Sequence, residues 1–340
     1  MKAFYLVKNG KADSAFELRD YNLPAPEDEQ VLIKTEAFGL NYADVMARLG
    51  LYRDCPPLPT VIGYEAVGHV EAVGKNVTTV KPGDRVLTFT RFGAYASHIL
   101  SPEIAVVPIN EDLPTGKAVA LATQYSTAWY AFEECKKLHK GDRILIHAAA
   151  GGVGTALVQL AKRRGCIIAG TASPHKHEYL KQQGVDLCID YRNQDFEKVL
   201  KKEGWAGKLD AVFDPVGGIS VRKGVNLLNS GGSMIMYGGS SMTDSKSPLH
   251  KLKVAAGFGL WSPIVLLMRS ISLIGVNMLH IGDDKPELLQ HCMQQVVELS
   301  QKGELNPTVG GEFKASELAK AHEYLESRQS IGKLVVHWED

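Results

Sequence analysis

A glycine-rich run near the middle of the chain combines residue types that can hold a phosphate group. It follows the hydrophobic segment 143–149 and precedes an amphipathic segment. A dinucleotide fingerprint needs glycine where the backbone approaches a pyrophosphate and where the next helix packs on the strand, although its first glycine is replaced here by alanine. N–H groups and the dipole at the start of that helix attract an anion. We therefore predict a pyrophosphate site formed by Ala149, Gly151, Gly152, Val153 and Gly154. The alternative is a tight turn that binds no nucleotide.

The residues after the next hydrophobic segment indicate which dinucleotide would bind. An NAD site usually carries an acid about 20 residues after the glycine run, where it binds the ribose 2′-hydroxyl. Here the segment ends in Ser173 without an acid, Lys176 follows, and Tyr191 ends the strand after it. We predict that these three side chains hold a 2′-phosphate, so that the cofactor is NADPH rather than NADH. The alternative for Lys176 is a solvated helix residue.

Strand-like and helix-like segments alternate from about residue 140, as is typical of a parallel, doubly wound sheet. The predicted strands are 143–149, 166–172, 187–191, 209–216, 233–238 and 273–277. Predicted helices lie between the first four strands, at 153–164, 175–183 and 195–203. The sequence therefore predicts an α/β protein with a Rossmann domain over residues 126–278.

The first 125 residues lack this alternation and read as β-rich. Short strand-like segments at 30–37, 66–73, 84–90 and 95–100 are separated by glycine and proline, which favours a compact barrel-like domain. The tail reads as two helices, 286–301 and 315–327, and a closing strand, 333–337. We expect it to complete the first domain, giving a domain of residues 1–125 plus 279–340.

Composition excludes some classes of partner. The chain of 340 residues carries 38 basic and 38 acidic residues, so bulk charge does not favour a nucleic acid. Its five cysteines contain no C-x-x-C pair, which indicates free thiols in a reducing compartment. The N-terminus lacks the apolar core of a secretory signal, and we expect a cytoplasmic protein.

The most apolar stretch, 254–268, is too short to span a bilayer and is interrupted by two glycines and a proline. We expect a helix or loop over a pocket, with a peripheral contact to a membrane surface as the alternative. Its large side chains, Phe258, Trp261 and Leu266, would then roof an acceptor site or pack against a partner subunit.

Three segments of the first half, 39–44, 61–68 and 81–86, together with the glycine-rich run and the domain order, resemble the medium-chain dehydrogenase/reductase superfamily. The resemblance covers nearly the whole chain. Within the superfamily the chain resembles the zinc-independent quinone oxidoreductase branch, and the runs 148–154, 170–178 and 214–218 are close to its vesicle amine transport protein subgroup. The resemblance implies a GroES-like catalytic domain and a Rossmann domain with the active site in a cleft between them. It also implies homodimers joined near Leu273–Asn277.

The resemblance also indicates where zinc-dependent relatives hold their catalytic metal. Those positions carry Asn41, Tyr64, Glu65 and Thr123 here, and the four-cysteine lobe that binds a structural zinc is missing after Thr90. Zinc prefers thiolate and imidazole ligands, and Glu65 alone cannot hold it. We predict no metal site and expect Tyr64 to fill the space of the zinc.

By resemblance, three side chains line the place where hydride transfer would occur. Tyr52 matches a pocket residue whose phenol could donate a hydrogen bond to an acceptor carbonyl. Asn41 and Thr127 match positions that contact the nicotinamide or the substrate. Their alternatives are a loop anchor for Tyr52, a turn residue for Asn41 and a helix-start cap for Thr127.

Three further positions are expected near the cofactor, again by resemblance. Gly238 and the backbone around Asn277 would flank the nicotinamide, and Lys333 would reach the cofactor from the C-terminal strand. The alternative for Lys333 is an ordinary charge on an edge strand.

Without a metal, such a protein can still hold a nicotinamide against an electron-poor acceptor, because the cofactor supplies the reactive group. The first hypothesis is an NADPH-dependent quinone oxidoreductase acting by one- or two-electron reduction on a small hydrophobic acceptor. The second is a reductase of the double bond in alkenals or enones. The third belongs to another class: an NADPH-binding, membrane-associated scaffold with little turnover.

Overall fold

The protein is described by a computed structural model that covers residues 1–245 and 247–338. The chain divides into two compact units. Unit 1 comprises Met1–Ser126 and Met278–Asp340, and unit 2 comprises Thr127–Asn277. Each unit is described separately.

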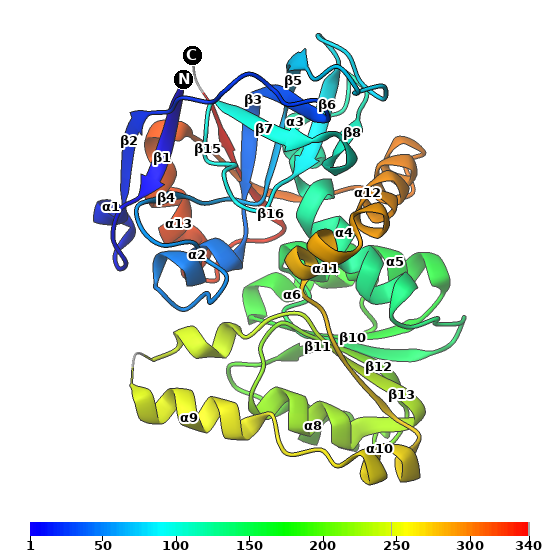
Figure 1. Ribbon diagram of the computed structural model, residues 1–340. Helices are drawn as coiled ribbons and strands as arrows, with labels where there is room; N and C mark the ends of the chain where they lie inside the picture. Colours follow the sequence, from blue (N-terminus) through cyan, green and yellow to red (C-terminus); the bar gives the residue numbers. More distant parts are fainter. Residues whose placement is uncertain (246, 339–340) are drawn as a thin grey trace. The chain divides into compact units, whose positions relative to one another are not determined.

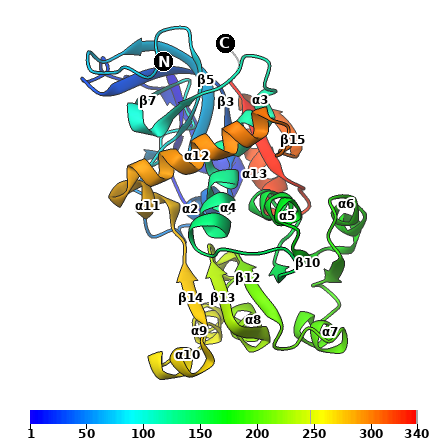
Figure 2. The same cartoon turned by 90° about the vertical axis from the view of Figure 1, so that its right-hand side faces the viewer.

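Unit 2 is built on a six-stranded sheet in the order β11-β10-β9-β12-β13-β14, and every neighbouring pair is parallel (Figure 1). Figure 2 shows β12, β13 and β14 side by side. The order reverses between β9 and β12, which is the switch point beside which nucleotides bind in such sheets. This topology confirms the predicted Rossmann fold. The strands are β9 Arg143–Ile146, β10 Ile167–Ala172, β11 Leu187–Asp190, β12 Leu209–Asp214, β13 Leu228–Met236 and β14 Ser272–Gly275.

The helices of unit 2 begin or end where the sequence offers a capping side chain or a glycine. The first long helix ends at Gly165, whose φ of 79° is left-handed, and Asp195 accepts the Glu197 N–H at 3.0 Å to cap a later one. The first strand is three residues shorter than predicted, because the chain turns after Ile146 toward the helix. The helices are α5 Gly152–Arg164, α6 His177–Gln182, α7 Phe196–Lys202, α8 Ile219–Leu227, α9 Pro248–Gly257 and α10 Pro263–Arg269.

The core of unit 2 lies between the sheet and its helices. Leu145, Ala169 and Val212 from three neighbouring strands pack with Val221 and Val225 of α8, and all five are fully buried or nearly so. A sheet covered in this way holds the carboxyl ends of its strands in fixed relative positions.

Unit 1 contains two sheets. A seven-stranded sheet has the order β15-β16-β3-β5-β6-β8, with β7 also paired to β3, and a three-stranded sheet has the order β2-β1-β4. The strands are β1 Lys2–Leu6, β2 Phe16–Asp20, β3 Gln30–Leu40, β4 Thr60–Val61, β5 Glu65–Val73, β6 Arg85–Phe89, β7 His98–Pro102, β8 Val106–Pro108, β15 Val309–Lys314 and β16 Lys333–His337. Five of these, β1, β2, β4, β8 and β15, were not among the predicted strands. β15 contains two glycines, which weaken its strand pattern.

The tail adds both strands and helices to unit 1. β16 lies between β15 and β3 and pairs antiparallel to β3, with Leu334 opposite Leu40. The predicted helix 315–327 begins as a 3₁₀ turn and becomes α-helical at Leu318. The helices are α1 Ala12–Ala15, α2 Tyr42–Arg48, α3 Thr115–Ala120, α11 Met278–Asp284, α12 Pro286–Gln301 and α13 Leu318–Glu326, while α4, Ser126–Trp129, crosses the division between the units.

Two sequence-level expectations concern the chain as a whole. All five cysteines are free thiols, as predicted. Of the helices in residues 1–245 and 247–338, none has the length and apolar character needed to cross a membrane.

Candidate functional site

The glycine-rich turn connects the end of β9 to the start of α5. Gly151 is the N-cap, and α5 begins at Gly152, so the N–H groups of its first turn have no acceptor within the helix. A Cβ on Gly154 would lie 2.3 Å from the Ala148 carbonyl oxygen, which only glycine avoids. The close approach of helix to turn that the fingerprint requires is therefore present, and the N–H groups and dipole at the helix start suit a pyrophosphate.

The alanine that replaces the first glycine of the fingerprint is accommodated by the neighbouring strand. Ala149 is fully buried, and its N–H donates to the Thr171 carbonyl at 3.0 Å. Opposite it lies Gly170 of β10, where a Cβ would be 2.9 Å from the Ala149 Cβ. The methyl group that the turn gains is thus matched by a missing side chain on β10. The departure from the fingerprint leaves the turn intact.

Three residues predicted to hold a 2′-phosphate gather at the ends of β10 and β11. Ala172 and Asp190 are paired in register, and this brings the Ser173 hydroxyl to 3.4 Å from the Tyr191 hydroxyl. Lys176 follows on a 3₁₀ turn and is only 7% exposed, so the alternative of a solvated helix residue is wrong. Burial and the neighbouring Arg192 guanidinium lower the pKa of Lys176 to about 8. Two cations placed so close together favour an anion beside them.

The other strand ends contribute a buried carboxylate and two predicted cofactor neighbours. Asp214, at the end of β12, is fully buried and accepts hydrogen bonds from the Val216 and Gly217 N–H groups. Gly238 follows β13 closely, and a Cβ there would lie 2.7 Å from the Pro215 carbonyl oxygen. Asn277 follows β14 and is exposed. Both predicted neighbours of the nicotinamide therefore lie at the same edge of the sheet as the glycine turn.

Unit 1 holds a buried ion pair that the sequence analysis did not anticipate. Lys333 and Glu65 are both fully buried, and the Lys333 ammonium pairs with Glu65 Oε1. The same ammonium donates to Asn41 Oδ1 at 3.1 Å and to the Leu40 carbonyl at 3.2 Å, while Asn41 Nδ2 donates to Glu65 Oε1 at 2.7 Å. Burial lowers the pKa of Lys333, and Glu65 opposes that shift. A Cβ on Gly39 would collide with both members of the pair, at 2.2 and 2.3 Å.

This Lys333–Glu65–Asn41 cluster corrects two alternatives. Lys333 lies on a strand with neighbours on both sides, so it is not an edge-strand charge. Asn41 is more than a turn residue: it is the N-cap of α2, and its N–H donates to the Asp44 carboxylate at 2.7 Å. Burial raises the pKa of Asp44 to about 8. A sequence signal existed for the cluster, since Gly39 lies within a strand whose other positions carry side chains.

The residues at the family's zinc positions do not fit a zinc ion. Asn41 and Glu65 bind the Lys333 ammonium, and Tyr64 is buried with its ring against Phe92, at 5.2 Å between centroids. Zinc would have to displace a cation already paired with the single carboxylate. Within residues 1–245 and 247–338, no three His, Cys, Asp or Glu side chains are grouped so as to hold a metal.

Unit 1 contains a series of aromatic side chains in contact with one another. The Tyr52 ring meets the Tyr64 ring edge-on at 6.2 Å, and Tyr64 in turn contacts Phe92. Burial, with the negative charge of Asp54, raises the pKa of Tyr52 to about 12. The half-buried Tyr52 phenol is therefore protonated at neutral pH and can donate a hydrogen bond. The sequence analysis missed Phe92, which has a φ of 86°, unusual for a non-glycine residue, in the short turn after Thr90.

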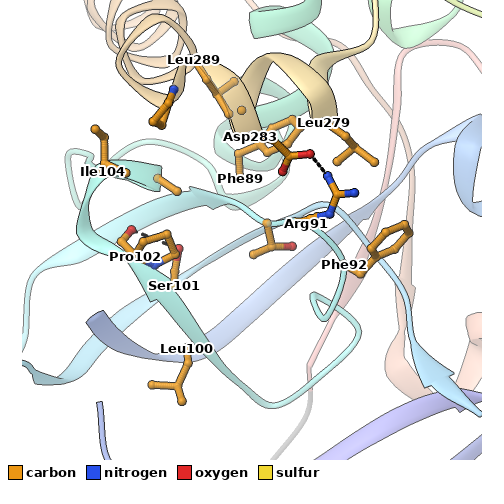
Figure 3. A pocket seen from close by; sticks show the side chains of 14 residues that line it. Phe89, Arg91, Phe92, Leu100, Ser101, Pro102, Ile104, Leu279, Asp283 and Leu289 are labelled. Atoms are coloured by element: carbon orange, nitrogen blue, oxygen red, sulfur yellow. Dashed lines mark hydrogen bonds and ion pairs between the residues drawn. The ribbon is translucent and has the colours of Figure 1, made fainter. Parts of the chain in front are cut away.

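A cavity of about 340 Å³ lies within unit 1 next to this turn (Figure 3). Arg91 pairs with Asp283 in its wall, joining the turn to α11. The remaining wall is mostly apolar and includes Phe89, Phe92, Ile104, Leu279 and Leu289. Phe92 contributes to both the cavity and the aromatic series, so the two form one apolar region.

Thr127 and three side chains of the insertion all differ from their expected settings. Thr127 is 8% exposed and lies inside a continuous helical run, preceded by the π-helical residues Leu121–Tyr125, so it is not a helix-start cap. Phe258, Trp261 and Leu266 pack against the core of unit 2 itself. These three side chains anchor the insertion to its own sheet and do not form the expected roof.

Comparison with known proteins agrees with this geometry. The family model described as alcohol dehydrogenase GroES-like domain matches residues 27–111, and the model described as zinc-binding dehydrogenase matches residues 183–336. The human synaptic vesicle membrane protein VAT-1 homolog is 34% identical over 319 residues, covering 92% of this chain and 80% of that protein.

Solved structures share the fold over essentially the whole chain. The Escherichia coli quinone oxidoreductase complexed with NADPH superposes with a TM-score of 0.86 at 25% identity, covering 99% of this chain and 100% of that one. The CurK enoyl reductase superposes with a TM-score of 0.86 at 26% identity, covering 99% of both chains. The chain belongs to the medium-chain dehydrogenase/reductase family, in its quinone oxidoreductase-like branch.

Proposed function

We propose that this protein is an NADPH-dependent reductase that transfers hydride to quinones or similar electron-poor acceptors. The observation that carries the proposal is the buried Lys176, beside Ser173 and Tyr191 at the end of β10, in the place where an NAD site carries an acid. The similarity to a quinone oxidoreductase complexed with NADPH supports the same assignment.

In this proposal the residues of unit 2 hold the cofactor. The turn from Ala149 to Gly154 and the first turn of α5 bind the pyrophosphate, and Ser173, Lys176 and Tyr191 bind the 2′-phosphate. Gly238 and Asn277 flank the nicotinamide, which supplies a hydride when it is bound. Thr127, also in unit 2, completes the set of residues proposed to border it.

The residues of unit 1 would receive and orient the acceptor. Tyr52 donates a hydrogen bond to the acceptor carbonyl, where negative charge grows during reduction. Asn41, held by Lys333 and Glu65, presents a fixed polar edge. The apolar series of Tyr64 and Phe92 favours a hydrophobic acceptor and excludes water. A quinone needs no Lewis acid under this scheme, which agrees with side chains that do not fit zinc.

A second candidate acceptor is the double bond of an enone or alkenal. The similarity to the CurK enoyl reductase favours it. That structure superposes on this chain with the same TM-score, 0.86, as the quinone oxidoreductase. The same residues would serve both reactions, because each delivers hydride to an electron-poor carbon conjugated with a carbonyl.

The deciding experiment measures NADPH consumption across a panel of quinones, enones and alkenals, with product analysis. Hydroquinone supports the first proposal, because a hydride carries two electrons, and a saturated carbonyl supports the second. Semiquinone as the first product would instead indicate one-electron reduction and contradict direct hydride transfer. Tight NADPH binding without oxidation by any acceptor would instead favour the scaffold hypothesis.

Replacement of Lys176 tests the cofactor assignment. We expect Lys176→Met to weaken NADPH binding roughly 10- to 150-fold, because a charge-assisted hydrogen bond contributes about 1.5–3 kcal/mol. NADH binding should be nearly unchanged. Lys181→Met is the matched control, since Lys181 is exposed on the following helix. Equal losses for the two cofactors would refute a 2′-phosphate contact.

The pH dependence of binding tests the same lysine independently. Below about pH 8 the Lys176 ammonium is charged in the free protein, and above it the charge is lost. A bound phosphate dianion favours the charged form, so binding at higher pH requires proton uptake. We expect the Kd for NADPH to rise by up to about tenfold per pH unit above this value. The Kd for NADH should change less, and parallel pH profiles for the two cofactors would contradict the assignment.

Replacement of Tyr52 tests the donor to the acceptor. We expect Tyr52→Phe to lower kcat/KM for a quinone by about tenfold, the value of one neutral hydrogen bond of about 1.4 kcal/mol. NADPH affinity should be retained. Tyr21→Phe provides a control, because Tyr21 is a half-buried phenol packed against Tyr5 in the same unit. An unchanged kcat/KM for Tyr52→Phe would remove the proposed donor.

A further inference from the structure

The cavity in unit 1 is large for a protein interior, where few voids exceed the size of a water molecule. Its volume of about 340 Å³ lies within the range of roughly 300–1,000 Å³ that is usual for small-molecule sites. Its walls come from two segments of unit 1, within residues 89–105 and 279–289, and the second segment includes α11 and the start of α12 (Figure 3). We call this space the α11 cavity.

The interior of the α11 cavity is apolar. Phe89, Leu279 and Leu289 line it and are at most 5% exposed, so they present hydrocarbon to the space. Gly282 also lines it from within α11, although glycine is less favourable than alanine inside a helix. A Cβ at this position would lie 2.9 Å from the Leu289 side chain. The missing side chain therefore leaves room in this wall.

The polar side chains that line the α11 cavity already have partners in the protein. The Thr90 hydroxyl donates to a main-chain carbonyl at 3.2 Å, and the Ser101 hydroxyl lies 2.7 Å from the Thr88 hydroxyl. Arg91 pairs with Asp283, and their side chains are 49% and 40% exposed, which places this ion pair at the rim. A water molecule in a cavity needs two to four polar partners. The paired side chains and the apolar interior therefore favour a hydrocarbon occupant.

Two sets of contacts connect the α11 cavity with the residue proposed to orient the acceptor. Phe92 lines the cavity, its ring lies 5.2 Å from the Tyr64 ring, and Tyr64 meets Tyr52 at 6.2 Å. α11 also contacts the loop that follows Tyr52, because His280 Nε2 lies 3.3 Å from Asp54 Oδ1. Aromatic side chains in contact with one another therefore lead from the Tyr52 phenol to the cavity wall.

We propose that the α11 cavity binds a hydrocarbon chain carried by the acceptor. An apolar cavity of ~150 Å³ admits benzene, with its six carbons, so the α11 cavity has room for a chain on the order of ten carbons. The acceptor ring would meet Tyr52, and its alkyl or prenyl chain would pass Phe92 into the cavity. This inference rests on the proposed function and deepens it, because it names an acceptor with an apolar chain rather than a bare ring.

A comparison of two quinones with the same ring tests this proposal. The pair is dimethoxymethylbenzoquinone and its decyl derivative. Isothermal titration calorimetry without NADPH gives the Kd of each quinone, since no hydride is then supplied. We expect the decyl quinone to bind at least tenfold more tightly, because each buried methylene contributes about fourfold. With NADPH, the chain should lower KM and leave kcat nearly unchanged, since it lies away from the reacting carbon.

Variants that fill the cavity show where the chain binds. Ile104→Trp and Gly282→Leu add volume from the two separate wall segments, so the test survives if one variant fails to fold. In both variants we expect the Kd values of the two quinones to become equal within about twofold. Leu18→Trp is the matched control, because Leu18 is 55% exposed on β2 and does not line the cavity. It should keep the chain preference of the unaltered protein. NADPH binding, which depends on unit 2, reports whether each variant is folded.

Two results would overturn the proposal. The first is an equal Kd for both quinones in the unaltered protein. The second is an undiminished chain preference in folded cavity variants, which would place the chain elsewhere. Failure of the reductase proposal looks different. Turnover of both quinones without a chain effect keeps the reductase and removes the chain site, whereas chain-dependent binding without NADPH oxidation keeps the chain site and removes the reductase.

Discussion

The burial of one ammonium group constrains the centre of the large sheet of unit 1. Lys333 begins β16, Glu65 begins β5, and both strands pair with β3, so the ion pair spans the strand between them. Removing one member of such a buried pair leaves an uncompensated charge and typically costs about 3–5 kcal/mol. Gly39 is required beneath the pair, and Asn41 is oriented by both charges. The C-terminal strand is therefore tied to residues near the start of the chain by electrostatics as well as by backbone hydrogen bonds.

This pair also explains how the family's metal position can be filled without a metal. In this chain the positive charge next to Glu65 comes from a side chain, and that charge is covalently fixed and cannot exchange ligands. A zinc ion polarises a bound oxygen directly. The Lys333 ammonium instead uses its hydrogen bonds on Glu65, Asn41 and the Leu40 carbonyl, and so it orients these groups. Under the proposed function, such a site would suit acceptors that need orientation and exclusion of water more than activation.

Unit 2 meets a different constraint, the convergence of strand ends at one edge of a parallel sheet. The glycine turn, the Ser173–Tyr191 contact, the buried Asp214 and Gly238 come from strands separated by many residues, and the sheet alone brings them to one edge. The insertion after β13 is different. It packs Phe258 and Trp261 against the core of unit 2 and leaves other apolar side chains exposed. Apolar surface maintained at the outside of a well-packed framework is a feature of binding, since folding alone favours its burial.

The sequence by itself determined the elements whose patterns are local. The alternation of strands and helices, the glycine turn, the helix Pro286–Gln301 and the strand Lys333–His337 follow from periodicity, caps and glycine, and the structure has them at or near the predicted bounds. The missing acid after β10 and the absent zinc ligands are likewise legible from residue types. Short or glycine-containing strands such as β1 and β15 were beyond this reasoning, because their pairing partners, not their own patterns, make them strands.

Only the tertiary structure decided which charges are buried and what they meet. Lys176 and Lys333 are both single lysines in the sequence, yet one lies beside Arg192 and the other against Glu65, 268 positions away in the chain. Leu260 is fully exposed whereas the adjacent Trp261 is partly buried against the core of unit 2, and tertiary contacts decided this difference too. Hydrophobicity and charge are properties of a residue, but burial and pairing depend on contacts between segments that no local pattern encodes.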